Sequence, residues 1–409
     1  MKKLKTIFSP RKILVWILLF ILAVTVPEFA KPAMSQTEAI VTMMCVDYVD
    51  DKFSLSASIL TPAEGKKANY TFYNAVGQSV GEAVDNVSLA IGKEMGFSQC
   101  EVMAFGDNLC EKGIISALDF MVRMKKVSQN ATLINFGGDI QDFSKAIFKL
   151  VSQKQLKLEQ ILNFDEQYVL SKDSSVENFY KSYFSKISTS VMPKITVAKQ
   201  QKDNAIEVQT DQSSGQSENA TASTDEDKLY LLNDGTIGVF KKGKKQLEMD
   251  YNQVADVNLF VNKKYEGLVV VNNVNDSLYN DATVVMNIVS SKPKIKVTFE
   301  DDKPKYTLKL TLKMHIEEIV QDEQKQAFMR RNKDFYTDEL VKKLYEKVQS
   351  NAQSAIDFCK SNQVDLLNVF RDFNAFENKQ FKKYIEKVGI ENYLNNVEFK
   401  TEIQIDNAF

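Results

Sequence analysis

Lys305 to Glu317 (KYTLKLTLKMHIE) is the stretch of sequence that decides the fold of the second half of the chain. From Tyr306 to Ile316 every second residue is apolar, and the residues between them are all polar. A period of two is typical of a strand with one face in a core and the other in water. It predicts an antiparallel sheet, in which Lys294–Phe299 is the partner strand across a turn at Asp301–Pro304.

The sequence after this strand predicts a long helix and a return to the sheet. Residues 334–361 carry apolar side chains at three- and four-residue spacing, which indicates an amphipathic helix. A shorter helix is predicted around Asn378–Val388, and a last strand is predicted at Val397–Ile405. We therefore expect one amphipathic helix lying over a twisted antiparallel sheet.

The sequence before this strand predicts more β structure. Glu266–Asn272 and Thr283–Ser290 are predicted strands, and Gln246–Lys263 has a weak helical period. Lys228–Leu232 and Thr236–Lys241 are predicted to form a hairpin, because Asn-Asp-Gly lies between them and favours a tight turn.

The first half of the chain alternates strands with helices. Ala39–Tyr48 and Phe53–Pro62 predict a hairpin across Asp50-Asp51, and Gln78–Met95 changes to a helical period. The later elements are two strands and three helices: Glu101–Phe105 and Thr132–Phe136, then Ile114–Met124, Asp139–Ser152 and Gln155–Lys186. This order predicts a sheet with helices packed on it, so the predicted fold class is α+β with several mixed α/β domains.

A polar, acidic segment divides these two halves. Gln200 to Asp227 is rich in Ser, Gln, Asn and Thr and cannot bury enough apolar surface to offset the loss of chain entropy. The predicted organisation is a signal or anchor segment, an N-terminal domain, a flexible linker and a C-terminal domain, at residues 1–33, 34–199, 200–227 and 228–409.

The N-terminus has basic residues followed by an uncharged apolar run. Lysine and arginine before an apolar segment remain on the cytoplasmic side, so the rest of the chain is expected to be exported. The run fits a signal peptide in length, but its cleavage site is poor, so a cleaved signal and an uncleaved anchor both remain open. The segment comprises Ile13, Leu14, Val15, Trp16, Ile17, Leu18, Leu19, Phe20, Ile21, Leu22, Ala23, Val24, Thr25 and Val26.

Composition argues against several classes of function. The formal net charge is −2, which gives no global basic field for nucleic acid. The only histidine, His315, is predicted on the solvent face of the alternating strand, so no histidine-based metal or catalytic cluster is expected. The four cysteines have no metal-ligand spacing; Cys100 and Cys110 are either buried free thiols or, less favoured, a disulfide. No cofactor, metal or catalytic residue is predicted, and the chain is expected not to be an enzyme.

Two glycine-containing passages are candidates for anion binding, and the first of them, a partial phosphate loop, is rejected. Gly238 to Lys244 matches part of a phosphate loop, but Lys245 stands where Ser or Thr is needed, and the passage lies in a predicted hairpin. Gly137-Gly138-Asp139 could bind an anion at a helix start, although Asp139 as a simple N-cap is the favoured interpretation. The lysine-rich residues 241–245 are interpreted as a solvated hairpin tip.

Several passages of the chain, in a fixed order, resemble one family. Those in the first half are Val46-Asp47, Gly77–Asn86 (GQSVGEAVDN), Phe97–Ile114 (FSQCEVMAFGDNLCEKGI), Leu118–Arg123 (LDFMVR) and Ala131–Gly138 (ATLINFGG), and the second half adds Gly235–Gly243 (GTIGVFKKG). This order resembles the Ger(x)C family, the C subunits of spore germinant receptors. Three features depart from it: the lipobox Cys is absent, Gln99 replaces a common His, and a Phe-rich stretch (Phe370, Phe373, Phe376, Phe381) replaces a Trp.

The resemblance implies a non-enzymatic spore germination protein of a sporulating bacterium. Such a subunit would sit on the outer face of the spore inner membrane and sense nutrients together with membrane A and B subunits. A small-molecule germinant would then act through the complex. The alternative hypothesis is an envelope-anchored solute-binding or scaffold protein outside germination. A secreted hydrolase is the third and least favoured hypothesis, because no nucleophile–base pair can be named.

Overall fold

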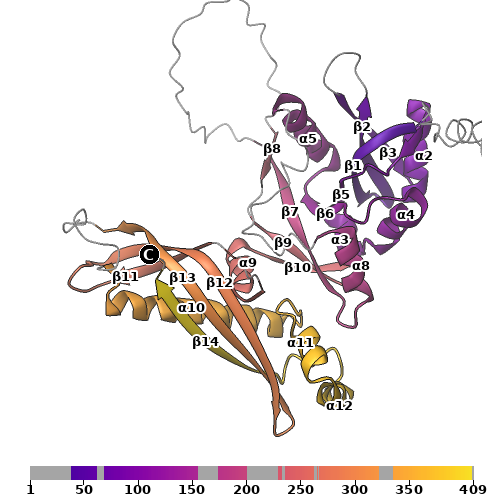
Figure 1. The fold of residues 1–409 in the computed structure, drawn as a ribbon. Helices are drawn as coiled ribbons and strands as arrows, with labels where there is room; N and C mark the ends of the chain where they lie inside the picture. Colours follow the sequence, from indigo (N-terminus) through magenta and orange to yellow (C-terminus); the bar gives the residue numbers. More distant parts are fainter. Residues whose placement is uncertain are drawn as a thin grey trace, which may run out of the picture. The chain divides into compact units, whose positions relative to one another are not determined.

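Two sheets with helices packed against them make up the part of the chain that the computed structural model describes (Figure 1). This confirms the predicted mixed α/β class. The described residues are 38–61, 69–154, 174–199, 229–232, 235–261, 265, 267–321 and 335–407.

The first sheet has a parallel centre and antiparallel edges. β1, β5, β6 and β7 run parallel to one another, and the strand order is β10-β9-β7-β6-β5-β1-β2-β3, with β4 paired to β1 and β8 to β7. The strands are β1 (Glu38–Val49), β2 (Lys52–Thr61), β3 (Asn69–Gly77), β4 (Glu94–Gly96), β5 (Val102–Gly106), β6 (Thr132–Gly137), β7 (Thr189–Lys199), β8 (Leu229–Leu232), β9 (Ile237–Lys241) and β10 (Lys244–Met249).

Helices cover both faces of this sheet, as its nearly continuous apolar strands require. They are α2 (Val80–Ile91), α3 (Asp107–Lys112), α4 (Ile115–Lys125), α5 (Ile140–Lys154) and α8 (Val176–Phe184). Met44 and Val46 of β1 join one apolar cluster, and the alternate residues Met43 and Cys45 join a second one on the opposite face. Side chains of β1 are therefore buried on both faces of the sheet, each beneath helices.

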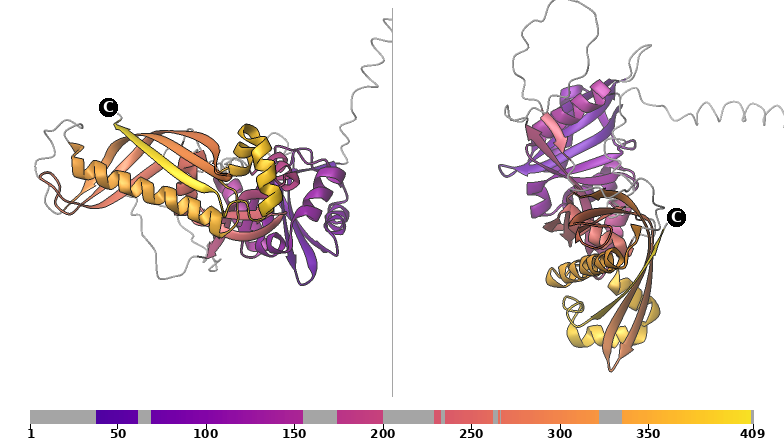
Figure 2. Two further views of the ribbon diagram at one scale, coloured as in Figure 1. Left: turned by 90° about the horizontal axis from the view of Figure 1, so that it is seen from below. Right: turned by 90° about the vertical axis from the view of Figure 1, so that its left-hand side faces the viewer.

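The second sheet is smaller and is built around one very long hairpin. Its strands are β11 (Gly267–Val274), β12 (Ala282–Glu300), β13 (Lys303–Val320) and β14 (Glu398–Asn407), in that order. Its helices are α9 (Tyr251–Val261), α10 (Asp338–Ser361), α11 (Val369–Phe376) and α12 (Asn378–Val388). α10 runs along one face of this sheet in both views of Figure 2, and the alternate apolar residues of β13 are buried in the core that α10 shares.

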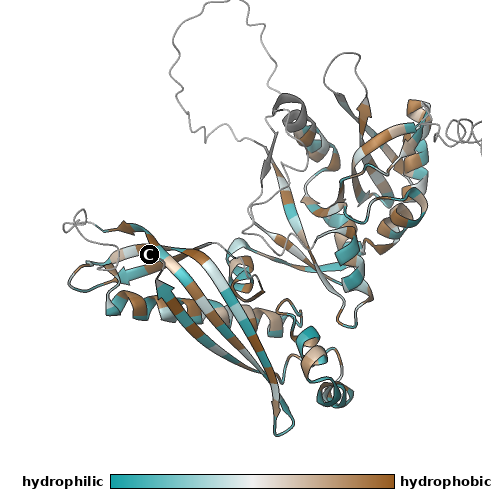
Figure 3. Cartoon of the chain, viewed as in Figure 1, coloured by the Kyte–Doolittle hydropathy of each residue, from teal (hydrophilic) through white to brown (hydrophobic). Residues whose placement is uncertain are grey.

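Both predicted Asp-Asp turns are confirmed. Asp50 and Asp51 have φ of 50° and 57°, and Asp301 and Asp302 have φ of 50° and 61°. Two successive residues with positive φ form the turn whose twist matches that of a hairpin. The turn at Asp301 aligns β12 with β13 so that Glu300 lies opposite Lys303, and the apolar residues of the predicted alternation are buried from Tyr306 to Met314. Figure 3 shows this alternation as teal and brown bands along β13.

Two features differ from the sequence prediction. β14 pairs parallel to β13, because a helical connection returns the chain to the start of β13. β8 and β9 do not form the predicted hairpin; both pair with β7 instead, and the hairpin is β9–β10, whose turn residues Lys242 and Gly243 have φ of 52° and 74°.

The predicted linker, residues 200–227, lies outside the described residues. Lys199 and Leu229, which flank residues 200–228, pair with each other in β7 and β8. This segment therefore connects two neighbouring strands of the first sheet. The domain boundaries at 199 and 228 stay predictions, and so does the membrane segment Ile13–Val26, which lies outside the described residues. Within the described part of the chain, no helix is both long and apolar enough to cross a membrane.

Candidate functional site

The ends of the parallel strands β1 and β5 bring two of the family-like passages into contact. The carboxylate of Asp47 accepts hydrogen bonds from the Leu109 backbone N–H (3.0 Å) and the Asn108 side-chain amide (3.1 Å). Gly106 makes this approach possible, because a Cβ there would lie 2.1 Å from Cγ of Asp47. Burial raises the pKa of Asp47, and these hydrogen bonds offset part of that rise. The glycine is therefore needed for space, since its φ of −67° suits any residue.

Four charged residues next to this contact form what we call the charged junction: Asp107, Lys194, Lys245 and Glu248. Nζ of Lys194 lies 3.1 Å from Asp107 and 2.7 Å from Glu248. Nζ of Lys245 pairs with Asp107 and lies 2.8 Å from Glu248. Two cations and two carboxylates thus alternate around a closed ring that joins α3, β7 and β10.

Burial distinguishes the members of the charged junction. The Lys245 side chain is 6% exposed and that of Lys194 is 15% exposed, whereas Asp107 and Glu248 are about one-third exposed. Asn135, fully buried in β6, places its amide oxygen 3.5 Å from Nζ of Lys245 and donates to the Phe105 carbonyl at 3.0 Å. The predicted solvated position of Lys245 is therefore wrong, because its charge has partners 138 residues away in the sequence.

The pairing in the charged junction outweighs the cost of desolvation. Burial alone would raise the pKa of Asp107 and Glu248, but hydrogen bonds and attraction from Lys245 and Lys194 hold both values below the ordinary range. Burial alone would lower the pKa of the two lysines, and the carboxylates raise it instead. All four groups stay charged at neutral pH, so none is poised as a general acid or base.

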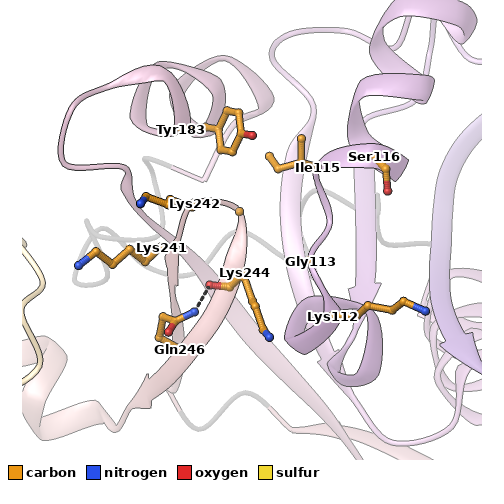
Figure 4. Close-up of a pocket in the computed structure, with 10 residues that line it drawn as sticks. Lys112, Gly113, Ile115, Ser116, Tyr183, Lys241, Lys242, Lys244 and Gln246 are labelled. Carbon is orange, nitrogen blue, oxygen red and sulfur yellow. Dashed lines mark hydrogen bonds between the residues drawn. The ribbon is translucent and has the colours of Figure 1, made fainter.

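The tip of the β9–β10 hairpin packs beside α3 and α4 and borders an open hollow that we call the lysine pocket (Figure 4). It has a volume of about 460 Å³. The Gly243 carbonyl accepts a hydrogen bond from the Ile114 N–H at 3.0 Å, and a Cβ on Gly243 would lie 2.2 Å from the Ile115 side chain. The pocket is lined by Lys112, Gly113, Ile115, Ser116, Tyr183, Lys241, Lys242, Gly243, Lys244 and Gln246.

Lysine dominates the charge of the lysine pocket, and no carboxylate lines it. Lys112 lies over the Tyr48 ring, 3.1 Å from its centroid, while Lys241 and Lys242 lie 2.7 and 3.5 Å from the Glu391 carboxylate. The pocket could accept a small anion or an acidic side chain.

The other residues considered from the sequence lie apart from this site. His315 is partly exposed on β13 and lies 3.1 Å from Glu317. Asp139 caps α5, accepting hydrogen bonds from the backbone of Gln141 and Asp142, which confirms the N-cap interpretation. Cys100 and Cys110 are buried free thiols, so the disulfide alternative is wrong. Burial raises the pKa of Cys100 to about 12, so this thiol is not an activated nucleophile.

Sequence reasoning singled out the passages but not their meeting point. Gly106 and Asp107, Asn135, and Gly243 all belong to passages quoted for the family resemblance, and all of them contribute to this corner of the first sheet. Lys194 and Glu248 were missed, because nothing in their local sequence marks them. Within the described residues, no group of His, Cys, Asp and Glu side chains could hold a metal ion.

Comparison with known proteins identifies the family of the chain. The family profile described as "Spore germination protein N-terminal domain" matches residues 35–197, and "Spore germination B3/ GerAC like, C-terminal" matches residues 235–407. The chain belongs to this family of spore germination proteins. The second match begins at the residues of β9, which the structure places in the first sheet, so the family's two sequence regions share that sheet.

A solved structure has a similar fold. The structure reported as "Crystal Structure of the GerBC protein" has a TM-score of 0.51 and 14% sequence identity, covering 90% of this chain and 97% of that chain. At this identity the likeness supports the architecture alone. No curated protein matches the sequence.

Proposed function

We propose that the chain is the non-enzymatic C subunit of a nutrient germinant receptor, anchored in the spore membrane and acting with membrane A and B subunits. The observation that carries the proposal is the match of both family profiles across residues 35–197 and 235–407. The convergence of the family-like passages at the charged junction supports it, because the ion pairs join α3, β7 and β10 and so have a structural role.

The lysine pocket favours a second candidate, an envelope-anchored protein that binds a small anionic solute. The two candidates differ in what they need: a receptor subunit needs partner subunits, whereas a solute-binding protein works without them. The pocket's volume of about 460 Å³ is within the range of small-molecule sites.

Germination of spores lacking the gene tests the proposal. A panel of single nutrients is applied to deletion spores, to spores complemented with the wild-type gene and to spores complemented with a Lys245→Met gene, and the fall in optical density is followed. A receptor-independent germinant is the control for general damage. We expect loss of the response to one nutrient class, restored by the wild-type gene.

Co-purification provides the second arm. The tagged full chain, extracted from spore membranes with mild detergent, should retain multi-span A and B subunits. A normal response to every nutrient, together with no co-purified membrane subunit, would refute the receptor proposal and leave the solute-binding candidate.

A further inference from the structure

The face of the second sheet that points away from the core carries a dense array of lysines. β12, β13 and β14 each contribute to it, and the strand register places Lys294 of β12 directly beside Lys309 of β13. Thr307 of β13 lies between Lys296 of β12 and Lys400 of β14. We call this surface the basic face; its lysines are Lys292, Lys294, Lys296, Lys305, Lys309, Lys313 and Lys400.

Carboxylates on the same face neutralise only part of this charge. Lys305 lies 2.9 Å from Glu300 and 3.7 Å from Glu398. Glu402 lies 2.9 Å from Lys400 and 3.8 Å from Lys309. The other lysines form no ion pair with any carboxylate of the described residues: Lys292, Lys294, Lys296 and Lys313. The face is therefore positive although the chain as a whole has a net charge of −2.

The pairing of Lys294 with Lys309 is unfavourable in the isolated protein. Like charges directly opposite each other on neighbouring strands repel, and opposite charges at such positions would be stabilising. A bound anion would remove this repulsion. A hollow of about 380 Å³ lies over these lysines. Five lysines line it against two carboxylates, Glu300 and Glu402, so the excess of positive charge suits an anionic group.

The composition of the basic face distinguishes a lipid surface from a protein partner. Protein interfaces are enriched in aromatic residues and depleted of lysine. The outward positions from 292 to 300, from 305 to 313 and from 398 to 406 hold no aromatic residue. Clusters of four to eight lysines or arginines are, by contrast, typical of segments that bind anionic membrane surfaces.

We propose that the basic face docks on an anionic phospholipid bilayer, with lipid phosphates contacting Lys294, Lys296 and Lys309. This inference goes beyond the proposed function, because it assigns a membrane-facing surface to a folded part of the chain. It does not depend on a nutrient response, so either proposal can fail without the other.

Lysine modification by an amine-reactive reagent, read by mass spectrometry, tests the contact. The full chain is mixed with phosphatidylcholine vesicles, or with vesicles in which phosphatidylglycerol replaces part of that lipid. We expect the modification rate of the basic-face lysines to fall roughly fivefold with phosphatidylglycerol, and the protection to disappear at high salt. Lys342, Lys379 and Lys383, exposed on α10 and α12, are internal controls whose rates should not change.

A triple variant, Lys294→Gln, Lys296→Gln and Lys309→Gln, should abolish the protection of the remaining basic-face lysines. A matched variant with the three control lysines changed to Gln should keep it. Equal modification rates in the two kinds of vesicle would overturn the proposal. It would also be overturned if inorganic phosphate alone protected the lysines as well as the vesicles do, or if only spore membranes containing partner proteins protected them.

Discussion

Replacing Lys245 with Met tests whether the ion pairs of the charged junction hold the β9–β10 hairpin against α3 and β7. Met keeps the length and the apolar stem of the side chain but removes the ammonium group. Asp107 and Glu248 would then share Lys194 as their remaining cation. Asn135 would lose the contact of its amide oxygen with Nζ of Lys245.

The magnitude follows from burial. Breaking a fully buried ion pair by removing one partner costs about 3–5 kcal/mol. The Lys245 side chain is 6% exposed, but Asp107 and Glu248 are 30% and 35% exposed and keep a second cation. We therefore expect Lys245→Met to lower the free energy of unfolding by about 2–3 kcal/mol, and Asp107→Asn to couple to it by about 1–2 kcal/mol in a double-mutant cycle.

Urea unfolding followed by circular dichroism measures this loss, and hydrogen exchange locates it. The matched control is Lys244→Met, the exposed neighbour in the same hairpin, which we expect to change stability by no more than about 0.5 kcal/mol. Amides of β9 and β10 should exchange faster in Lys245→Met than in the control. Equal stability of the two variants would refute the claim that the network holds the hairpin.

Three further predictions concern pH and packing. The lysines of the charged junction lower the pKa of Asp107 and Glu248, so these ion pairs stabilise the fold above the ordinary carboxyl pKa and lose that effect as pH falls and the carboxylates become protonated. The free energy of unfolding should therefore fall more in the wild type than in Lys245→Met when the pH is lowered. Burial raises the pKa of Asp256 to about 7, so stability should fall as pH rises from about 4 to 7, where this carboxyl is ionised in the unfolded state but protonated in the folded state. Asp256→Asn, measured by thermal unfolding at pH 5 and 8, should gain about 1–2 kcal/mol more at pH 8 than at pH 5, and an equal gain at both values would contradict this assignment. Gly106→Ala should lower the free energy of unfolding by about 2–4 kcal/mol, because the new Cβ would displace Asp47. The control Gly92→Ala should cost about 1 kcal/mol, since φ is 66° there but no atom lies within 4 Å. Similar losses of stability for the two variants in urea unfolding would argue against the steric role of Gly106.

Local signals in the sequence predicted most of the second sheet. The alternation from Tyr306 to Ile316 and the turn at Asp301-Asp302 are properties of consecutive residues, and together they fix the β12–β13 register. The same kind of signal failed at Asn233–Gly235. That turn is locally favourable, but β7 provides a pairing partner for both β8 and β9 that a local reading does not include.

The functional site was less predictable because its members lie far apart in the sequence. The passages around Gly106, Asn135 and Gly243 were recognised in order, yet their contacts depend on how the parallel strands are arranged. The parallel order of β1, β5, β6 and β7 places their ends at one edge. Each strand end contributes only one or two constrained residues to the site. The sequence pattern of such a site is therefore spread over several short passages.

Lysine illustrates the limit of sequence reasoning most clearly. Lys245 and Lys294 both lie in lysine-rich β segments, and composition treats them alike. In the structure, Lys245 is buried between two carboxylates, whereas Lys294 is exposed and faces another lysine. Removal of the charge should therefore destabilise the fold at Lys245 and relieve repulsion at Lys294. The Lys294–Lys309 pair is unfavourable for folding, so its presence is better explained by binding of an external anion than by a role in stability.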